Sequence, residues 1–160
     1  LAEAIDGICK MNLQLVILGT GEIKYHTLLE GITKKFPKVI SLHLKFDDPL
    51  AHKIYAGSDI FLMPSKYEPC GLGQLISLRY GTIPLVFKTG GLADTVNKDN
   101  GFVFGQYSKE GLVKKVKEAL QAFKDRQDWD RLMQTAMNCN FSWSESARQY
   151  IRLYETAVAK

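Results

Sequence analysis

Cysteine is scarce in this sequence, and long apolar runs are missing from it. The three cysteines, Cys9, Cys70 and Cys139, are an odd number without CxxC spacing, which argues against a disulfide framework or a zinc knuckle. No run reaches the roughly 18 apolar residues of a membrane-spanning helix, and no basic-then-apolar signal segment opens the chain. We therefore predict reduced thiols in a cytoplasmic type of compartment and no membrane partner.

A strong excess of charge of one sign is also absent. Lysine and arginine number 21 against 17 acidic residues, so the formal net charge is only +4. This balance suits an anionic small ligand, whereas a nucleic-acid-binding protein usually carries a denser basic stripe. The best local run is Lys114, Lys115 and Lys117, which fits the solvated face of a helix. We expect no nucleic-acid partner.

What the sequence does contain is a regular alternation of short apolar segments with helical patterns. At 160 residues with 46% hydrophobic and 24% charged residues, the composition and length suit one globular domain. Because the apolar segments are apolar on both faces, they predict an α/β fold, a Rossmann-like parallel sheet with helices on both faces. Strands are expected at residues 13–18, 39–44, 59–64, 83–87 and 101–104.

Helix signals fall between and after these segments. Asp48-Pro49 predicts a helix start, with Asp48 as the N-cap. Ser142 and Glu145 match a capping box and predict a final helix over residues 142–160. The other helices are expected at residues 1–9, from about 23 to before 37, 48–57, 72–78, 108–123 and 128–138, and Ser108 can cap the one over residues 108–123.

Ligands of such sheets bind beyond the carboxyl ends of the strands, which here means residues 19–22, 45–48, 65–73 and 88–95. The first of these, Gly19-Thr20-Gly21, resembles a dinucleotide fingerprint, but Lys24 stands where the third glycine belongs. We interpret it as an ordinary tight turn.

The segment from Ser65 to Gly73 is more informative. Gly71 and Gly73 allow a ligand close to the backbone at the start of a helix, whose first N–H groups and dipole favour a phosphate. Glu68 is better suited to accept hydrogen bonds from hydroxyls, as on a sugar attached to that phosphate.

A second glycine segment, Thr89-Gly90-Gly91, follows the next strand, and the two segments can lie side by side in a parallel sheet. Either segment alone could be a tight turn that needs glycine for steric reasons. Together with Glu68, which we expect to be buried, they predict a phosphate-sugar site.

Three stretches carry a family resemblance: residues 68–75 (EPCGLGQL), 79–84 (RYGTIP) and 89–96 (TGGLADTV). They resemble the glycogen and starch synthases, retaining glucosyltransferases of the GT-B fold, and a more general similarity covers nearly the whole chain. The resemblance implies a C-terminal donor domain spanning residues 1–160, in the cytoplasm of a bacterium or the plastid stroma of a plant. It implies no metal or cofactor.

The resemblance also implies roles at the site. Glu68 would contact the donor glucose, and Phe46 would stack on adenine. The donor, usually ADP-glucose, would otherwise be surrounded by Tyr67, Cys70, Gly71, Leu72, Gly73, Thr89, Gly90 and Gly91. The reaction would extend an α-1,4-glucan at a 4-hydroxyl with retention. Two positions depart from related enzymes: Ile76 stands where many have a second carboxylate, and Gly73 where many have threonine.

Other chemistry is weaker in the sequence. Cys70 has no histidine near it, which argues against a thiol nucleophile, and Asp128-Trp129-Asp130 opens a helical segment rather than following a strand, which argues against a metal site. Lys66 and Lys88 flank the glycine segments and are equally compatible with phosphate neutralisation or with plain solvation. The alternatives are another retaining GT-B glucosyltransferase and a non-catalytic nucleotide- or glucan-binding module.

The resemblance further implies that the chain is incomplete. Relatives have an acceptor-binding N-terminal domain, and also a central strand with a Lys/Arg-bearing loop between the strands that begin here near Leu13 and Asp59. We therefore expect no synthase activity and weak donor binding from these residues alone. We also expect either that those two strands close the gap directly or that another segment fills it.

Overall fold

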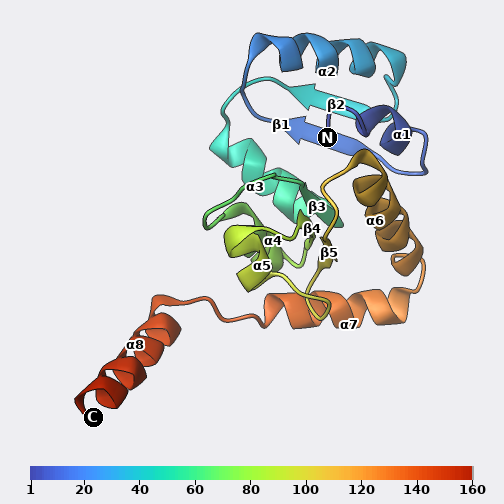
Figure 1. Cartoon of the computed structure of the whole chain (residues 1–160). Helices are drawn as coiled ribbons and strands as arrows, with labels where there is room; N and C mark the ends of the chain where they lie inside the picture. The colour runs from blue at the N-terminus through green and yellow to red at the C-terminus, as the bar shows by residue number, and fades with distance from the viewer. Residues whose placement is uncertain (160) are drawn as a thin grey trace.

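The computed structural model describes residues 1–159 and shows an α/β fold with two parallel sheets (Figure 1). In the first sheet β1 (Leu15–Leu18) pairs with β2 (Ile40–His43), and in the second β4 (Ile83–Phe87) lies between β3 (Ile60–Met63) and β5 (Phe102–Phe104). All five predicted strands are confirmed, with ends that differ by at most two residues.

Helices connect the strands and cover them (Figure 1). The predicted helices are found, and one further short helix occupies residues that we expected to be a loop. The bounds are α1 (Ile5–Cys9), α2 (Ile23–Lys35), α3 (Asp48–Gly57), α4 (Gly73–Tyr80), α5 (Gly90–Thr95), α6 (Lys109–Ala122), α7 (Arg126–Met137) and α8 (Trp143–Val158).

Two predicted helix starts were wrong because the capping carboxylate lies earlier in the chain. The N-cap of α3 is Asp47, not Asp48, since the Asp47 side chain accepts a hydrogen bond from the Leu50 N–H at 2.9 Å. Similarly, α7 begins two residues before the expected position because Asp125 caps it by accepting from the Asp128 N–H at 3.1 Å. In α6 the predicted cap, Ser108, is confirmed by its bond to the Gly111 N–H.

The strand β4 forms the core of the second sheet even though it contains Pro84, a residue that central strands usually exclude. Ile83 donates its N–H to the carbonyl of Asp59, which directly precedes β3, so the backbone of Pro84 faces β5 instead. Pairing with β5 begins only at Leu85, which lies opposite Phe102. The missing N–H of Pro84 therefore removes no bond from the ladder.

The buried side chains form clusters on both faces of the sheets. One cluster joins β4 and β5 to α1 and α6, another joins α4 to α7 around Trp129, and a third joins β1 and β2 to α1 and α2. A smaller cluster packs α5 on β4. The helices thus cover both faces, as the apolar pattern predicted.

Between β1 and β3 the described residues form no backbone pairing, so the two sheets stay separate. The expectation that these strands close the gap or that another segment fills it was therefore wrong, and the gap remains as an apolar cavity lined by both strands. The reason is that residues 1–159 contain only the five strands already described. Each of them is already paired with a neighbour in its own sheet, so none is available to fill the gap.

The last helix, α8, projects away from the rest of the molecule (Figure 1). Ser142 accepts from the Glu145 N–H as predicted, but the Glu145 carboxylate pairs with Arg148, so only half of the capping box forms. Its apolar stripe is uncovered, and the Trp143 side chain is 89% exposed. None of the described helices is both long and apolar enough to span a membrane.

Candidate functional site

The segment between β3 and α4 contains the strongest sequence signals, and its glycines are required by its shape. Gly71 has φ of +75°, a left-handed conformation that strains any other residue. Gly73, the first residue of α4, lies close to the Phe61 ring: a Cβ there would lie 3.0 Å from it, so a side chain would require that ring to shift slightly. The backbone therefore turns sharply into α4 at the carboxyl end of β3.

The two glycine segments lie against each other, as predicted. The Gly91 N–H donates to the Glu68 carbonyl at 3.0 Å. A Cβ at Gly91 would lie 2.3 Å from the Cys70 carbonyl oxygen, and one at Gly90 would lie 2.1 Å from the Glu68 carbonyl oxygen. Both glycines are thus needed for close packing of the two segments, so the steric explanation holds at these positions whatever the site binds.

Gln74, which the sequence analysis did not single out, holds this arrangement together. Its side chain is fully buried, and its Nε2 group donates to the carbonyls of Cys70 at 3.0 Å and Gly71 at 2.9 Å. It also lies 3.3 Å from the Thr95 hydroxyl, which itself donates to the Gly91 carbonyl. The signal that could have found it is helical spacing, because Gln74 shares a face with the buried residues Ser77 and Leu78.

The N-terminus of α4 is open. Its N-cap residue, Leu72, provides no side-chain cap, and within residues 1–159 the N–H groups of Gly73, Gln74 and Leu75 have no hydrogen-bond acceptor. These donors and the helix dipole attract an anion. The site thus offers what a phosphate requires, next to the Glu68 segment.

The side chains around this N-terminus differ in exposure. Glu68 is only half-buried, which corrects our expectation of a buried carboxylate, and no hydrogen bond or ion pair to its side chain is formed by the described residues. Tyr67, Cys70 and Leu72 are exposed. Glu68 is therefore free to accept hydrogen bonds from a ligand.

Phe46 lies elsewhere. It follows β2, in the first sheet, and its side chain is 88% exposed. The neighbouring Asp47 pairs with Lys45 at 2.6 Å, and the hydrogen bonds from Lys45 and from the Leu50 N–H lower the pKa of that carboxyl. Since the cavity separates β1 from β3, it also separates the sheet that carries Phe46 from the sheet that carries the glycine segments.

No metal ligand set is present among residues 1–159, where no group of three or more His, Cys, Asp and Glu side chains converges. In the Asp128-Trp129-Asp130 stretch, Asp128 pairs with Arg131 at 2.8 Å and Trp129 is part of the core. Lys66 and Lys88 are both exposed beside the glycine segments.

Comparison with known proteins agrees with this geometry. The family described as "Glycosyl transferases group 1" matches residues 1–134. Glycogen synthase of Geotalea uraniireducens (strain Rf4) is 53% identical over 167 residues, and that of Fervidobacterium nodosum is 47% identical. Both alignments cover the whole chain but only 34% of the relative, so the chain spans about a third of the length of these enzymes.

Solved structures give the same result. The catalytic domain of starch synthase IV from Arabidopsis thaliana, bound to ADP and acarbose, superposes with a TM-score of 0.84 at 37% identity, covering 99% of this chain and 35% of that one. Sucrose-phosphate synthase from Thermosynechococcus elongatus superposes with a TM-score of 0.73 at 19% identity over 99% of this chain and 42% of that one, which shows the shared fold. The strands, the glycine segments and these matches together place the chain in the group 1 glycosyl transferase family.

Proposed function

We propose that this chain is the donor-binding domain of a glycogen or starch synthase and that it binds ADP-glucose at the two adjoining glycine segments. The observation that carries the proposal is the hydrogen bond from the Gly91 N–H to the Glu68 carbonyl. It holds Thr89-Gly90-Gly91 against the segment that carries Glu68 and that leads into the open N-terminus of α4. The ADP bound to the starch synthase IV structure supports the choice of base.

The roles of the residues follow from their chemistry. The free N–H groups at the start of α4 would hold the diphosphate and stabilise its charge as it leaves. The Glu68 carboxylate would accept hydrogen bonds from glucose hydroxyls and fix the orientation of the sugar. Cys70, Gly71, Leu72 and Gly73 would surround the donor through their backbone, with Tyr67, Thr89, Gly90 and Gly91 along the same cleft.

The whole enzyme would transfer glucose to the 4-hydroxyl of an α-1,4-glucan with retention. The acceptor would bind mainly to parts outside these 160 residues, because the glycogen synthases that the chain matches are about three times as long. Residues 1–160 would therefore form one donor domain, with α8 (Trp143–Val158) as its C-terminal helix, and would be inactive alone. The location would be cytoplasmic, or the plastid stroma in a plant. Phe46 would stack on adenine if the sheet that carries it approaches the diphosphate site.

Isothermal calorimetry with ADP, ADP-glucose, UDP-glucose and a maltooligosaccharide tests the proposal. We expect heats from ADP and ADP-glucose and smaller or no heats from the other two. Binding of the oligosaccharide alone would favour a glucan-binding module, and preference for UDP-glucose would favour another GT-B glucosyltransferase. Absence of heat from every nucleotide would contradict the donor-domain proposal.

Glu68→Gln sharpens the test because it keeps the size of the side chain and removes its charge. We expect it to weaken the binding of ADP-glucose about tenfold and to leave the binding of ADP nearly unchanged. Only ADP-glucose carries the sugar hydroxyl whose hydrogen bond to the charged carboxylate is lost. Glu110→Gln, at an exposed position of α6, is the matched control. Equal weakening of ADP and ADP-glucose would contradict a role of Glu68 at the sugar.

A further inference from the structure

One buried polar side chain at the candidate site has an unpaired atom. The Nε2 group of Gln74 donates to the carbonyls of Cys70 and Gly71, but its Oε1 atom has no hydrogen-bond partner among residues 1–159. The opposite placement of oxygen and nitrogen would set Oε1 against two carbonyl oxygens, so these bonds fix the orientation of the amide. A buried acceptor without a partner is unfavourable. The amide thus serves the two carbonyls at a cost to its own oxygen.

The two carbonyls depend on this amide. Within the described residues no backbone N–H donates to the carbonyl of Cys70 or of Gly71, and the other contact is a long one of 3.7 Å from the Cys70 thiol to the Gly71 carbonyl. A thiol is a weak donor. Without a partner inside the protein, carbonyl oxygens turn toward water. Gln74 therefore keeps both oxygens on the buried side of the segment.

The planar peptide bond carries this effect to the outer side of the segment. In a trans peptide, the C=O of one residue and the N–H of the next point in opposite directions. Because the carbonyls of Cys70 and Gly71 point toward the buried amide, the N–H groups of Gly71 and Leu72 point away from it. Neither N–H has an acceptor within residues 1–159. The side chains of Cys70 and Leu72 are exposed, which agrees with an outer side open to a ligand.

The backbone conformation brings these N–H groups together. Gly71 is left-handed, with φ of +75°, and Leu72 is right-handed, with φ of −109° and ψ of −28°. Adjacent residues of opposite hand turn their successive N–H groups into one concavity that suits an anion. The free N–H groups of residues 73–75 at the start of α4 continue it. Five successive donors, from residue 71 to residue 75, thus form one array.

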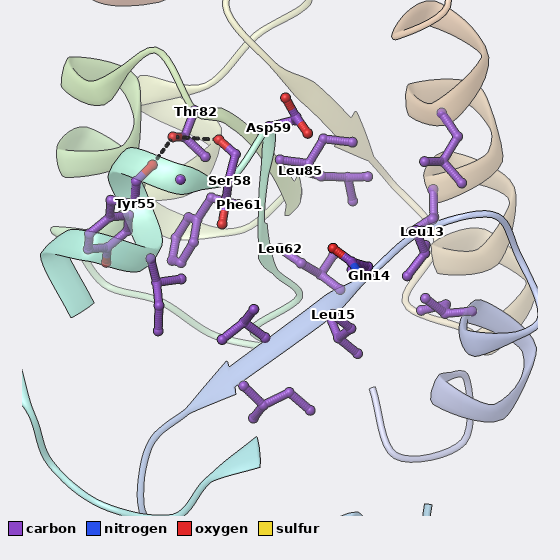
Figure 2. Close-up of a pocket in the computed structure, with 18 of the residues that line it drawn as sticks. Leu13, Gln14, Leu15, Tyr55, Ser58, Asp59, Phe61, Leu62, Thr82 and Leu85 are labelled. Carbon is purple, nitrogen blue, oxygen red and sulfur yellow. Dashed lines mark hydrogen bonds between the residues drawn. The ribbon is translucent and has the colours of Figure 1, made fainter. Parts of the chain in front are cut away.

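Other contacts hold the start of α4 in place. The rings of Tyr55 and Phe61 lie next to each other, with 5.2 Å between their centroids (Figure 2). A Cβ at Gly73 would lie 3.0 Å from the Phe61 ring and 3.2 Å from the Tyr55 hydroxyl, so the first residue of α4 rests on these two side chains. Within the helix, the Ser77 hydroxyl donates to the Gln74 carbonyl at 2.9 Å. Loss of the Gln74 amide should therefore disturb the peptides before α4 and leave the helix itself in place.

We propose that Gln74 is a positioning residue for the donor diphosphate. It holds the two peptide groups before α4 so that the N–H groups of Gly71 and Leu72 donate to the phosphates together with those of the helix. The Thr95 hydroxyl lies 3.3 Å from the Gln74 amide and donates to the Gly91 carbonyl at 2.6 Å, which ties the amide to the second glycine segment. This role rests on the proposed function, because it requires a diphosphate at this N-terminus.

Gln74→Met tests the orientation of the peptides without any ligand, because it keeps the length of the side chain and removes the donor. The two carbonyls should then turn toward water. Residual dipolar couplings, measured by NMR on the labelled chain, report the direction of each N–H, and we expect those of Gly71 and Leu72 to change. Ser77→Ala is the matched control, since it removes a buried hydrogen bond from the same helix and should leave both couplings unchanged.

Titration with inorganic pyrophosphate, followed through the amide chemical shifts, tests the effect on an anion. In the parent chain the amide protons of residues 71–75 should move downfield because they gain the anion as acceptor. Gln74→Met should weaken the binding of pyrophosphate about tenfold and abolish the shifts of Gly71 and Leu72. Ser77→Ala should bind pyrophosphate as the parent chain does. Because both variants lose a buried hydrogen bond, reduced stability does not explain a difference between them.

Any of three results would overturn the positioning role. The first is unchanged couplings of Gly71 and Leu72 in Gln74→Met, and the second is equal affinity of Gln74→Met and the parent chain for pyrophosphate. The third is the absence of shifts at Gly71 and Leu72 in the parent chain, a result that requires no variant to fold. The proposed function fails in a different way: pyrophosphate shifts these amides, but ADP-glucose gives no heat in calorimetry.

Discussion

The strands β1 and β4 have similar compositions and very different surroundings. Both are almost entirely apolar, yet β4 is buried on both faces whereas β1 has no buried residue. The difference lies in the neighbours, because β4 is paired on both edges and β1 on one. An apolar pattern therefore specifies the position that a strand occupies in a complete sheet, and the burial that it attains depends on which other strands are present.

Truncating one leucine in each kind of strand should give the largest difference in stability between them. Leu85→Ala in β4 removes a fully buried side chain, so we expect a loss of about 2–5 kcal/mol in the free energy of unfolding. Leu62→Ala in β3, at the edge of the cavity, should cost about 1 kcal/mol, because this side chain is only partly buried. Urea unfolding of both variants measures the difference.

Equal costs would show that the Leu62 side chain is as well packed in solution as that of Leu85. The gap would then be closed in the chain alone, and the contrast between the two strands would disappear.

The close packing of the second sheet extends to its loops, and Gly91→Ala tests this. The added Cβ would lie 2.3 Å from the Cys70 carbonyl oxygen, so one glycine segment must move away from the other. We expect a loss of about 1–3 kcal/mol in the free energy of unfolding, together with loss of ADP binding.

Gly105→Ala is the control, because a Cβ at that position meets no atom within 4 Å. Unfolding by urea and calorimetry with ADP should show it to be close to the parent chain. If Gly91→Ala kept both its stability and its affinity, the contact between the two segments would not be needed for the site.

Sequence reasoning was most successful where local chemistry decides the structure. The strands, the helix cap at Ser108 and the contact between the glycine segments could be predicted, because periodicity, capping residues and parallel topology each point to one answer. The missed helix over Gly90–Thr95 shows the limit, since two glycines and a short length suggest a loop. Its stability comes from Leu92, which is buried against Val86 of β4.

The parts of the site that could not be predicted depend on contacts between distant segments. Gln74 looks like an ordinary polar helix residue until the carbonyls of Cys70 and Gly71 and the hydroxyl of Thr95 surround its amide. The exposure of Phe46 and the half-burial of Glu68 depend likewise on how distant segments pack, which no local pattern records.

The smallest expected effect comes from an ion pair in the first sheet's half of the molecule. Asp6 of α1 pairs with Lys10 at 2.7 Å and with Lys35 of α2, and the hydrogen bonds from Lys10 and then Lys35 lower the pKa of its carboxyl from 3.8 to about 2. A pKa lowered by folding means that the pairing stabilises the folded state fully above pH 3.8. This contribution is lost as the pH falls toward about 2.

Asp6→Asn should therefore lower the thermal midpoint slightly at pH 6 and by much less near pH 2, where the carboxyl of the folded chain is already partly protonated. Salt at about 1 M should reduce the difference at pH 6 because the pair is exposed to solvent. Asp128→Asn, which breaks a pair within α7 rather than between helices, is the control. Of these two ion pairs, that of Asp6 joins α1 to α2, and α1 also packs on α6 of the other half. If Asp6→Asn removes the pH dependence of stability measured at the amides of β2 but not that measured at the amides of β5, the two sheets respond separately. A uniform loss would show instead that α1 already couples them.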